Sequence, residues 1–338
     1  MEQQLIIFNF IVQMLQGVVR KFGLQFQNKH NMILGKMLIS AGADLFSNKF
    51  LLGQISGGSL QLSIDYAGSW SNISQSFVNP IAVISSDGKY ILVGEQTNSG
   101  KLYISSNGGQ SFTVKHTITA IQRFSQVSMS ETGQYQLAVI FSGGRMISSD
   151  YGNTWNTPSG TIFYLDCYVS SSGQYMVTCA TTNGQLSVST NYGSTWSQKG
   201  SLRNWWSCSI SNDGQYITGV TNLGFIYKSS NSGTNWTEVG LSKYWLRVRM
   251  SDSGQYQLAI PQGTDRWYIS SNYGDTWTQG FVSTNSWTDI SVSKTGQYQY
   301  ACNSDTGLRV YRSTNYGASF STLGTTVTAD WRLIQVCK

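Results

Sequence analysis

The chain has 338 residues, of which 13% are aromatic and only 11% charged, with 35 glycines and 3 prolines. Aromatic residues and glycine turns at such low charge are typical of short β-strands, so the composition favours an all-β fold. The net charge is +6, but Lys and Arg are scattered singly rather than in runs. This pattern argues against a nucleic-acid-binding surface.

The amino-terminal segment, residues 5–19, is strongly apolar but is interrupted by Asn and Gln. It is too short and too polar to span a bilayer, and it lacks the basic start of a secretory signal. Its apolar residues recur every three or four positions, which predicts an amphipathic helix. The apolar positions are Leu5, Phe8, Val12, Leu15 and Val19.

Such a helix has to bury its apolar side. Packing against the rest of the chain, docking onto a partner and lying in a membrane interface all stay open as alternatives. We expect docking onto another protein or a second copy, because a closed repeat domain does not need this segment to cover its sheet edges.

A repeated motif follows, with the pattern Ser-x-Asp/Asn-x-Gly-x-x-Trp/Phe, in which an Ala replaces the Gly in the first copy. Its copies are Ser63–Trp70, Ser105–Phe112, Ser148–Trp155, Ser189–Trp196, Ser229–Trp236, Ser270–Trp277 and Ser313–Phe320. Copies 40 to 43 residues apart match the length of one four-stranded propeller blade. The Asp or Asn suits a turn that folds back onto backbone amides, the Gly suits a left-handed backbone, and the Trp is expected to be a mostly buried anchor.

A second motif, Ser-x-x-Gly-Gln/Lys-Tyr, runs in register with the first and predicts a hairpin turn. It occupies residues 85–90, 130–135, 170–175, 211–216, 251–256 and 293–298. A strand with alternating apolar positions precedes each copy. The unit is therefore an inner strand, this turn, two further strands, the first motif and an outer strand.

The last strand shows how the ring closes. Residues 331–336 begin with Trp331, as two other inner strands begin with Trp245 and Trp287, but no turn motif follows. The first copy has a strand near 50–55 and no inner strand of its own. We expect 331–336 to complete that blade. The prediction is an N-terminal helix and linker over 1–44, then an all-β, seven-bladed propeller over 45–338.

On these motifs, residues 45–336 resemble the Asp-box, or BNR-repeat, propellers. This superfamily includes sialidases, xyloglucan-cleaving glycosidases and the photosystem II assembly factor. The resemblance implies the fold, but members of the superfamily perform unrelated tasks.

The sialidase resemblance implies three convergent arginines and an Arg-Ile-Pro motif, and this motif is missing from the sequence. Arg203, Arg247 and Arg249 lie near the starts of inner strands and could bind an anion. The alternative interpretation is that they are exposed arginines at the edge of the propeller.

Hydrolysis of a glycosidic bond needs two carboxylates about 5–10 Å apart. The candidates outside the two motifs are Asp166, Asp289, Glu95, Asp265 and Asp305. Asp166 and Asp289 hold the same position in the inner strands of different blades, so both could face the central channel. The alternative is that each is an isolated polar residue solvated in the channel. No catalytic residue is assigned.

Aromatic residues gather where one blade passes into the next, and we expect most of them to pack between blades. Trp206 breaks this pattern and is the aromatic candidate for contact with a ligand. Five Cys without a C-x-x-C pair and only two His give no sign of a metal site or another cofactor, so the Cys are interpreted as packing residues.

Two functions remain open. The first is a non-catalytic interaction scaffold, part of a larger assembly, whose N-terminal helix docks onto a partner. The alternative is a carbohydrate-active propeller, either a glycan-binding module or a glycoside hydrolase. The polar, weakly charged composition is compatible with an extracellular or virion surface, and no cleaved signal is predicted.

Overall fold

The computed structural model describes residues 51–55, 59–118, 122–156, 162–280, 285–304, 310–323 and 331–336. The chain divides into two units, Met1–Leu45 and Phe46–Lys338, and the described residues belong to the second. They contain strands and turns but no helix, which confirms the all-β expectation. Accordingly, no helix in these ranges is long and apolar enough to cross a membrane.

Within the described residues the strands form seven sheets, here called blades 1 to 7. Blade 1 contains β4 (Pro80–Ile84), β5 (Ile91–Glu95), β6 (Lys101–Ser105) and β7 (Thr113–Thr117). Blade 2 contains β8 (Arg123–Met129), β9 (Gln136–Phe141) and β10 (Gly144–Ser148). Blade 3 contains β11 (Tyr164–Val169), β12 (Met176–Ala180), β13 (Gly184–Ser189) and β14 (Ser197–Arg203). Blade 4 contains β15 (Trp205–Ile210), β16 (Ile217–Thr221), β17 (Gly224–Ser229) and β18 (Thr237–Lys243).

The remaining blades follow the same plan. Blade 5 contains β19 (Trp245–Met250), β20 (Gln257–Pro261), β22 (Tyr268–Ser270) and β23 (Thr278–Gln279). Blade 6 contains β24 (Asn285–Val292), β25 (Gln299–Asn303), β26 (Val310–Ser313) and β27 (Ser321–Thr322), and β21 (Thr264–Asp265) pairs with the start of β24. Blade 7 contains β28 (Trp331–Val336), β1 (Leu51–Ile55), β2 (Leu60–Ser63) and β3 (Ser71–Asn72).

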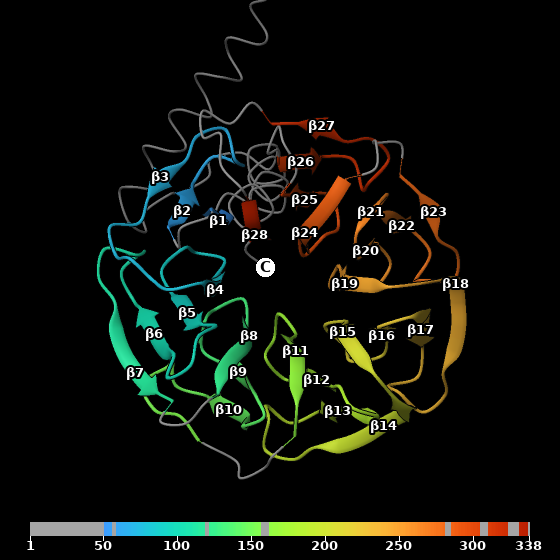
Figure 1. The fold of residues 1–338 in the computed structure, drawn as a ribbon, viewed down its shortest axis with the longest axis horizontal. Coiled ribbons are helices and arrows are strands. Elements are labelled where there is room, and N and C mark those ends of the chain that lie inside the picture. Colours follow the sequence, from blue (N-terminus) through green and yellow to red (C-terminus); the bar gives the residue numbers. More distant parts are fainter. Residues whose placement is uncertain are drawn as a thin grey trace, which may run out of the picture. The chain divides into compact units, whose positions relative to one another are not determined.

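The first strand named for each blade is its inner strand, and these strands lie around the central axis of the ring, called the channel below (Figure 1). Each inner strand contacts that of the next blade, in the order β4, β8, β11, β15, β19, β24 and β28, and β28 contacts β4. Blade 7 joins distant parts of the sequence, because β28 pairs antiparallel with β1, with Val336 opposite Leu51. Residues 331–336 therefore lie beside the strand near 50–55.

Each copy of the first repeated motif, here called the Asp-box after its Asp or Asn, forms the same compact turn. In the copy at Ser148–Trp155, the amide of Gly152 donates to Ser148 Oγ at 2.9 Å and the amide of Thr154 donates to Asp150 Oδ1 at 2.9 Å. Gly152 has a φ of 78°, a conformation that glycine adopts without strain. The side chain of Trp155 donates to the carbonyl of Gly152 at 3.2 Å. These contacts are confined to the turn, which gives the motif a structural role.

The turn after each inner strand connects neighbouring blades. The ring of Tyr216, in the turn of blade 4, stacks on Tyr273, in the Asp-box of blade 5, with centroids 4.6 Å apart. Gly254, in the turn of blade 5, lies against the same ring, and a Cβ there would be 2.8 Å from Cβ of Tyr216. This close approach, together with its φ of 77°, explains the Gly and the Tyr of the second motif.

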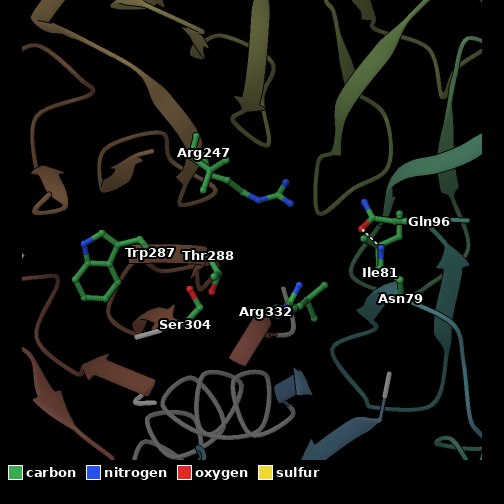
Figure 2. Close-up of a pocket in the computed structure, with 10 residues that line it drawn as sticks. Asn79, Ile81, Gln96, Arg247, Trp287, Thr288, Ser304 and Arg332 are labelled. Carbon is green, nitrogen blue, oxygen red and sulfur yellow. Dashed lines mark hydrogen bonds between the residues drawn. The ribbon is translucent and has the colours of Figure 1, made fainter. Parts of the chain in front are cut away.

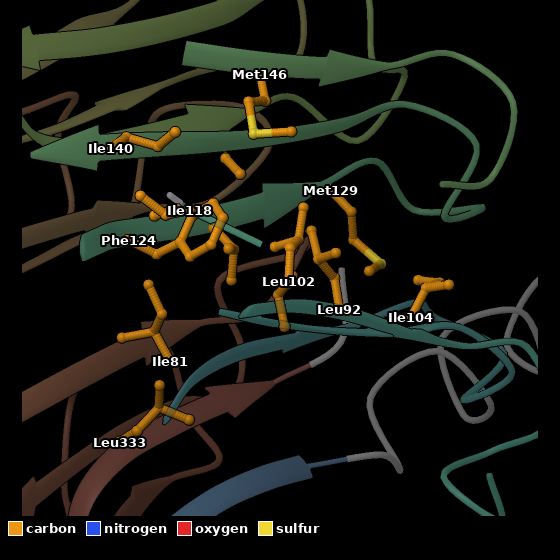
Figure 3. Close-up of a cluster of buried hydrophobic side chains, with 13 residues drawn as sticks. Ile81, Leu92, Leu102, Ile104, Ile118, Phe124, Met129, Ile140, Met146 and Leu333 are labelled. Atoms are coloured by element: carbon orange, nitrogen blue, oxygen red, sulfur yellow. The ribbon is translucent and has the colours of Figure 1, made fainter. Parts of the chain in front are cut away.

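Aromatic residues that lead the inner strands are buried between blades, as expected. They are Phe124, Tyr164, Trp205, Trp245, Trp287 and Trp331, each at most 3% exposed. Figure 3 shows one such core, in which Phe124 lies among aliphatic side chains of blades 1 and 2 and Leu333. Four described Cys are buried in the same kind of packing, at positions 167, 179, 208 and 302.

The Trp residues of the Asp-boxes are mostly buried, as expected, although less completely than those of the inner strands. Trp155, Trp196, Trp236 and Trp277 each pack against a buried cluster and keep intermediate exposure. The proposed N-terminal helix, with Leu5, Phe8, Val12, Leu15 and Val19, lies outside the described residues.

Candidate functional site

Inner strands place two layers of side chains at the channel. In blades 1 to 6 the upper layer stands four residues before the turn serine and is formed by Ile81, Gln126, Asp166, Ser207, Arg247 and Asp289, and Leu333 has the equivalent place in β28. The lower layer stands two residues before the turn and is formed by Val83, Ser128, Tyr168, Ser209, Arg249, Ser291 and Gln335. Alternation along a strand makes residues two apart share a face, so the candidate charges of blades 3, 5 and 6 belong to one face.

Asp166 is the centre of a buried charge cluster. Arg249 donates from Nη1 to Oδ2 at 2.8 Å and from Nη2 to Oδ1 at 3.1 Å, which is a two-point contact. The carboxylate also accepts from the Ser207 hydroxyl and from the amides of Cys167 and Cys208, at 3.0 and 3.2 Å for the amides. Asp166 is 1% exposed and Arg249 5%, so neither matches the solvated or edge position considered from the sequence.

Arg247 links this cluster to Asp289. Its Nε lies 2.9 Å from Oδ1 of Asp289, and its Nη1 lies 3.6 Å from Oδ1 of Asp166. The contact between Arg247 Nε and Asp289 Oδ1 is an ion pair without the geometry of a hydrogen bond. On its other oxygen, Asp289 accepts from the amide of Ile334 at 3.1 Å. The structure therefore brings together four of the predicted residues, Asp166, Arg247, Arg249 and Asp289.

Electrostatics keep the central pair ionised. Burial alone would raise the pKa of Asp166, but the charges of Arg249 and Arg247 and the hydrogen bonds outweigh it, so this pKa lies below its ordinary value of 3.8. Burial would lower the pKa of Arg249, and Asp166 reverses that effect, so the pKa of Arg249 is raised. A buried ion pair needs this many hydrogen bonds and opposite charges to offset the loss of its contacts with water.

The acidic side chains also join neighbouring inner strands. Oδ2 of Asp166 accepts the amide of Cys208 in the next blade, and Asp289 accepts the amide of Ile334 in the same way. Ser207 repeats this pattern, since its hydroxyl oxygen accepts the amide of Val248 at 3.2 Å. The inner edge of a blade carries backbone amides without a strand partner, and these side chains provide their acceptors.

One end of the channel, the turn end, is bridged by the turns that follow the inner strands. Backbone amides of Ser86, Glu131 and Asp252 donate to the carbonyls of Glu131, Ser171 and Lys294, each at 2.9 Å. Lys294 then pairs with Glu131 at 3.1 Å. The hydroxyl of Ser171 donates to Asp252 at 2.6 Å, from blade 3 to blade 5. These links leave the opposite end, where the inner strands begin, as the mouth of the channel.

A pocket of about 390 Å³ lies at this mouth. Its apolar lining is Ile81, Leu246, Trp287 and Leu333. Its polar lining is Asn79, Gln96, Arg247, Thr288, Ser304 and Arg332. Figure 2 shows the side chain of Arg247 extending from β19 into the space bordered by Gln96, Asn79 and Arg332. Arg332 is exposed, whereas 20% of the Arg247 side chain is exposed.

Trp206 lies near the start of β15, at an irregular point of this strand. The pairing of β15 with β16 shifts between Trp205 and Ser207, which leaves Trp206 as the extra residue of a β-bulge. Leu165 and Leu246 hold the same bulge position in the neighbouring strands β11 and β19. Trp206 is partly exposed, as a ligand-contacting aromatic needs to be, whereas the aromatics that lead the inner strands are buried.

Arg203 is not part of the cluster. It pairs with Glu238 at 3.2 Å and its guanidinium lies 4.1 Å from the centroid of the Tyr227 ring. With 34% of its side chain exposed, it fits the edge position that the sequence analysis offered as the alternative.

Sequence reasoning missed the polar groups of blades 1 and 7 at the mouth. Asn79 donates to Gln96 Oε1 at 3.4 Å, and Gln96 donates to the carbonyl of Ser125 at 3.3 Å. Arg332 follows the leading Trp of its strand, a position that could have signalled it. Within the described ranges no group of three or more His, Cys, Asp or Glu is placed to hold a metal ion.

No protein-family model matches the sequence, and no curated protein matches it. Solved structures do. The Cps50 (Swd1) β-propeller domain of Myceliophteria thermophila aligns with a TM-score of 0.54 at 13% identity, over 73% of this chain and 86% of that one. The chain has a β-propeller fold.

Other propellers align as well. The GH74 xyloglucanase from Xanthomonas campestris gives a TM-score of 0.63 at 12% identity and covers 85% of this chain. This propeller chain spans about half the length of that enzyme, 52%. YCF48 bound to D1 peptide gives a TM-score of 0.52 at 13% identity, over 72% of this chain and 81% of that one. At such low sequence identities the similarity establishes the fold alone, and function has to be argued from the site.

Proposed function

We propose that this chain is a seven-bladed propeller of the Asp-box type that acts as a non-catalytic binding scaffold, with its ligand face at the mouth of the channel. The observation that carries the proposal is the state of Asp166 and Asp289. Arginines and backbone amides occupy both carboxylates. A general acid or nucleophile of a glycosidase has to reach the substrate.

The other described carboxylates considered for hydrolysis are also engaged. Glu95 accepts from the amides of Val78 and Lys101, both at 3.1 Å. Asp265 pairs with Lys243 at 2.6 Å. Asp305, a fifth candidate, lies outside the described residues. These contacts support binding rather than bond cleavage.

The architecture supports the choice of face. Interlocked turns bridge the turn end, whereas the mouth offers a pocket, two arginines and the partly exposed Trp206. Loops and strand starts at one end of a rigid ring are where propellers and similar scaffolds place their binding groups.

The test compares wild type with Asp166→Asn and Asp289→Asn in hydrolysis assays on aryl glycosides and on xyloglucan, together with a glycan array. We expect no hydrolysis by any of the three. Turnover by wild type that either substitution abolishes would overturn the scaffold proposal.

A carbohydrate-active propeller is the second candidate, and the similarity to a GH74 xyloglucanase favours it. Trp206 would then stack on a sugar ring. On the glycan array, signal that Trp206→Ala removes without a change in melting temperature would support this candidate as a glycan-binding module.

The scaffold proposal includes docking through the N-terminal segment that contains Leu5, Phe8 and Val12. YCF48, with its D1 peptide, is an example of this fold holding a polypeptide. A chain that begins at Asn31 should fold but lose the association, which light scattering and co-purification with full-length protein as control would measure. Unfolding of the shortened chain would contradict docking and assign the segment to the propeller core.

A further inference from the structure

We propose that the turn end of the propeller binds an aromatic side chain of a partner polypeptide between Tyr175 and Ser232. This inference goes beyond the proposed function, because the site lies at the end opposite the mouth and uses none of the groups that line the pocket there. Three observations carry it: a repeated tyrosine stack, its half-complete copy between blades 3 and 4, and the exposed tyrosines on either side.

A stacked pair of tyrosines recurs at the turn end, between one blade and the next. The turn of one blade supplies one ring, and the Asp-box of the following blade supplies the other. The ring centroids lie 4.6–5.1 Å apart, with 25–37° between the ring planes, within the distance range of favourable aromatic pairs. The pairs are Tyr90 with Tyr151, Tyr135 with Tyr192, Tyr216 with Tyr273, Tyr256 with Tyr316, and Tyr298 with Tyr66.

The Asp-box tyrosine of each pair has a left-handed backbone, with φ between 59° and 62°. A residue with a Cβ is uncommon in this conformation. The repeat nevertheless places a tyrosine there in each of these pairs. The position of this ring is therefore a regular feature of the propeller and not the accident of one turn.

The interface between blades 3 and 4 has only half of the pair. Tyr175 lies against Gly214 of the next turn, where a Cβ would be 2.2 Å from Cδ1 of the tyrosine. Opposite it, Ser232 has the backbone that other Asp-boxes give to tyrosine, with a φ of 56° and an amide that donates to the carbonyl of Gln215 at 2.9 Å. In the part of the chain that the structure describes, no ring stacks on Tyr175, and both Tyr175 and Ser232 are partly exposed.

The complete pairs show what fits between Tyr175 and Ser232. Where they carry a phenol ring, Ser232 carries a hydroxymethyl group, so the place of one ring is open to another molecule. Tyr175 is already held for this contact, because its amide donates to Ser170 Oγ at 3.1 Å and its side chain packs against a buried cluster of blades 3 and 4. A ring that is fixed in advance loses little conformational entropy on binding.

The surroundings favour a polypeptide over a free small molecule. The stack of Tyr135 with Tyr192 lies at the preceding interface, and the stack of Tyr216 with Tyr273 lies at the following one. Tyr192 is 41% exposed, and tyrosine is enriched among the residues that dominate binding energy in protein interfaces. One stacked ring contributes little affinity by itself, so the ligand needs further contacts, which a polypeptide can make and a free ring cannot.

Peptide selection on the full chain tests the proposal. A phage-displayed library of random peptides is selected on wild type, and binding of the enriched peptides is measured by fluorescence anisotropy. Ser232→Tyr supplies the second ring from the chain itself and should weaken this binding at least about tenfold, or about 1.4 kcal/mol. The affected peptides should contain Tyr, Phe or Trp and lose binding when Leu replaces that residue. No enrichment, or equal binding by wild type and Ser232→Tyr, would overturn the inference.

Two further variants locate the site. Ala318→Tyr adds a tyrosine at an exposed position of the Asp-box of blade 6 and should leave peptide binding unchanged. Tyr175→Leu keeps an apolar side chain but removes the stacking face, so it should weaken binding as Ser232→Tyr does, and it carries the test if Ser232→Tyr does not fold. Melting temperatures check the folding of each variant. Equal loss of binding in Ala318→Tyr and Ser232→Tyr would contradict this site.

Other occupants give different results. Methyl glucoside that displaces the selected peptides would assign the position to a sugar ring. A wild-type dimer that Ser232→Tyr converts to monomer, measured by light scattering, would assign it to a second copy of this chain. Either result overturns the partner polypeptide. The proposed function is tested separately, because hydrolysis of glycosides would remove the scaffold proposal whatever the peptides show.

Discussion

Arg249 holds Asp166 by both of its terminal nitrogens, at 2.8 and 3.1 Å, and the two residues come from blades 5 and 3. Removing one member leaves the charge of the other buried without its partner, so Arg249→Met should lower the free energy of unfolding by about 3–5 kcal/mol. Urea denaturation measures this free energy. As a matched control, Arg203→Met breaks an exposed pair and should cost about 0–1 kcal/mol. Equal losses of unfolding free energy in the two variants would mean that the buried pair matters no more to stability than the exposed one.

The same pair makes stability depend on pH. The pKa of Asp166 is lower in the folded protein than its ordinary value of 3.8, so its contribution is present above that value and is lost as the pH falls through the folded pKa. Asp166→Asn removes this contribution at every pH. The stability difference between wild type and Asp166→Asn should therefore narrow from about pH 6 to about pH 2, as measured by denaturation at each pH. A constant difference would contradict the assignment.

Burial separates two kinds of tryptophan. Trp205 is 1% exposed, whereas Trp236, whose ring centroid lies 5.8 Å away, is partly buried. Trp205→Ala should cost about 3–5 kcal/mol. Trp236→Ala should cost only about 1–2 kcal/mol, since less of its surface leaves water on folding. Thermal and urea unfolding of the two variants would measure the ranking, and a reversed order would show that the Asp-box is the stronger anchor.

The interface between blades 3 and 4 lacks the tyrosine stack found at most of the other interfaces. Tyr175, in the turn of blade 3, has Ser232 at the Asp-box position where the next interface has Tyr273 opposite Tyr216. The φ of Ser232 is 56° and that of Tyr273 is 61°, so the backbone at Ser232 already has the conformation that a tyrosine adopts at this position. Ser232→Tyr should stabilise the protein by about 0.5–1.5 kcal/mol.

The control for this gain is Ser232→Tyr combined with Tyr175→Ala, in which the stack cannot form. A double-mutant cycle on melting temperature and urea midpoint measures the coupling. A gain that persists without Tyr175 would assign it to something other than stacking.

Local motifs made the strands and turns predictable. The Asp-box and turn motifs carry their own hydrogen bonds, as in the bond from Gly152 to Ser148, so residues close in sequence determine them. The strand signature of Trp331 placed 331–336 beside residues 50–55, and β28 pairs with β1. The shared register of Asp166 and Asp289 indicated that they face the same channel.

The partners of these charges were not predictable in the same way. Arg247 and Arg249 were weighed as edge arginines, because a repeat pattern says which face a residue occupies and not what approaches from other blades. Arg249 lies 83 residues from Asp166 in sequence. The difference in burial between Trp205 and Trp236 was not predictable either, since exposure depends on how the neighbouring blade packs.

The pairing of β28 with β1 also imposes an order on folding. Blades 1 to 6 use contiguous stretches of chain, so each can form from local contacts soon after its residues are available. Blade 7 has to join residues 51–55 to residues 331–336, and this contact has nearly the largest sequence separation that the described chain offers. Non-local pairing of this kind slows folding, because the chain entropy is lost before the contact forms. Until the last strand arrives, β1 presents an open edge, so a nascent or truncated chain is exposed to edge-to-edge aggregation that the closed ring avoids.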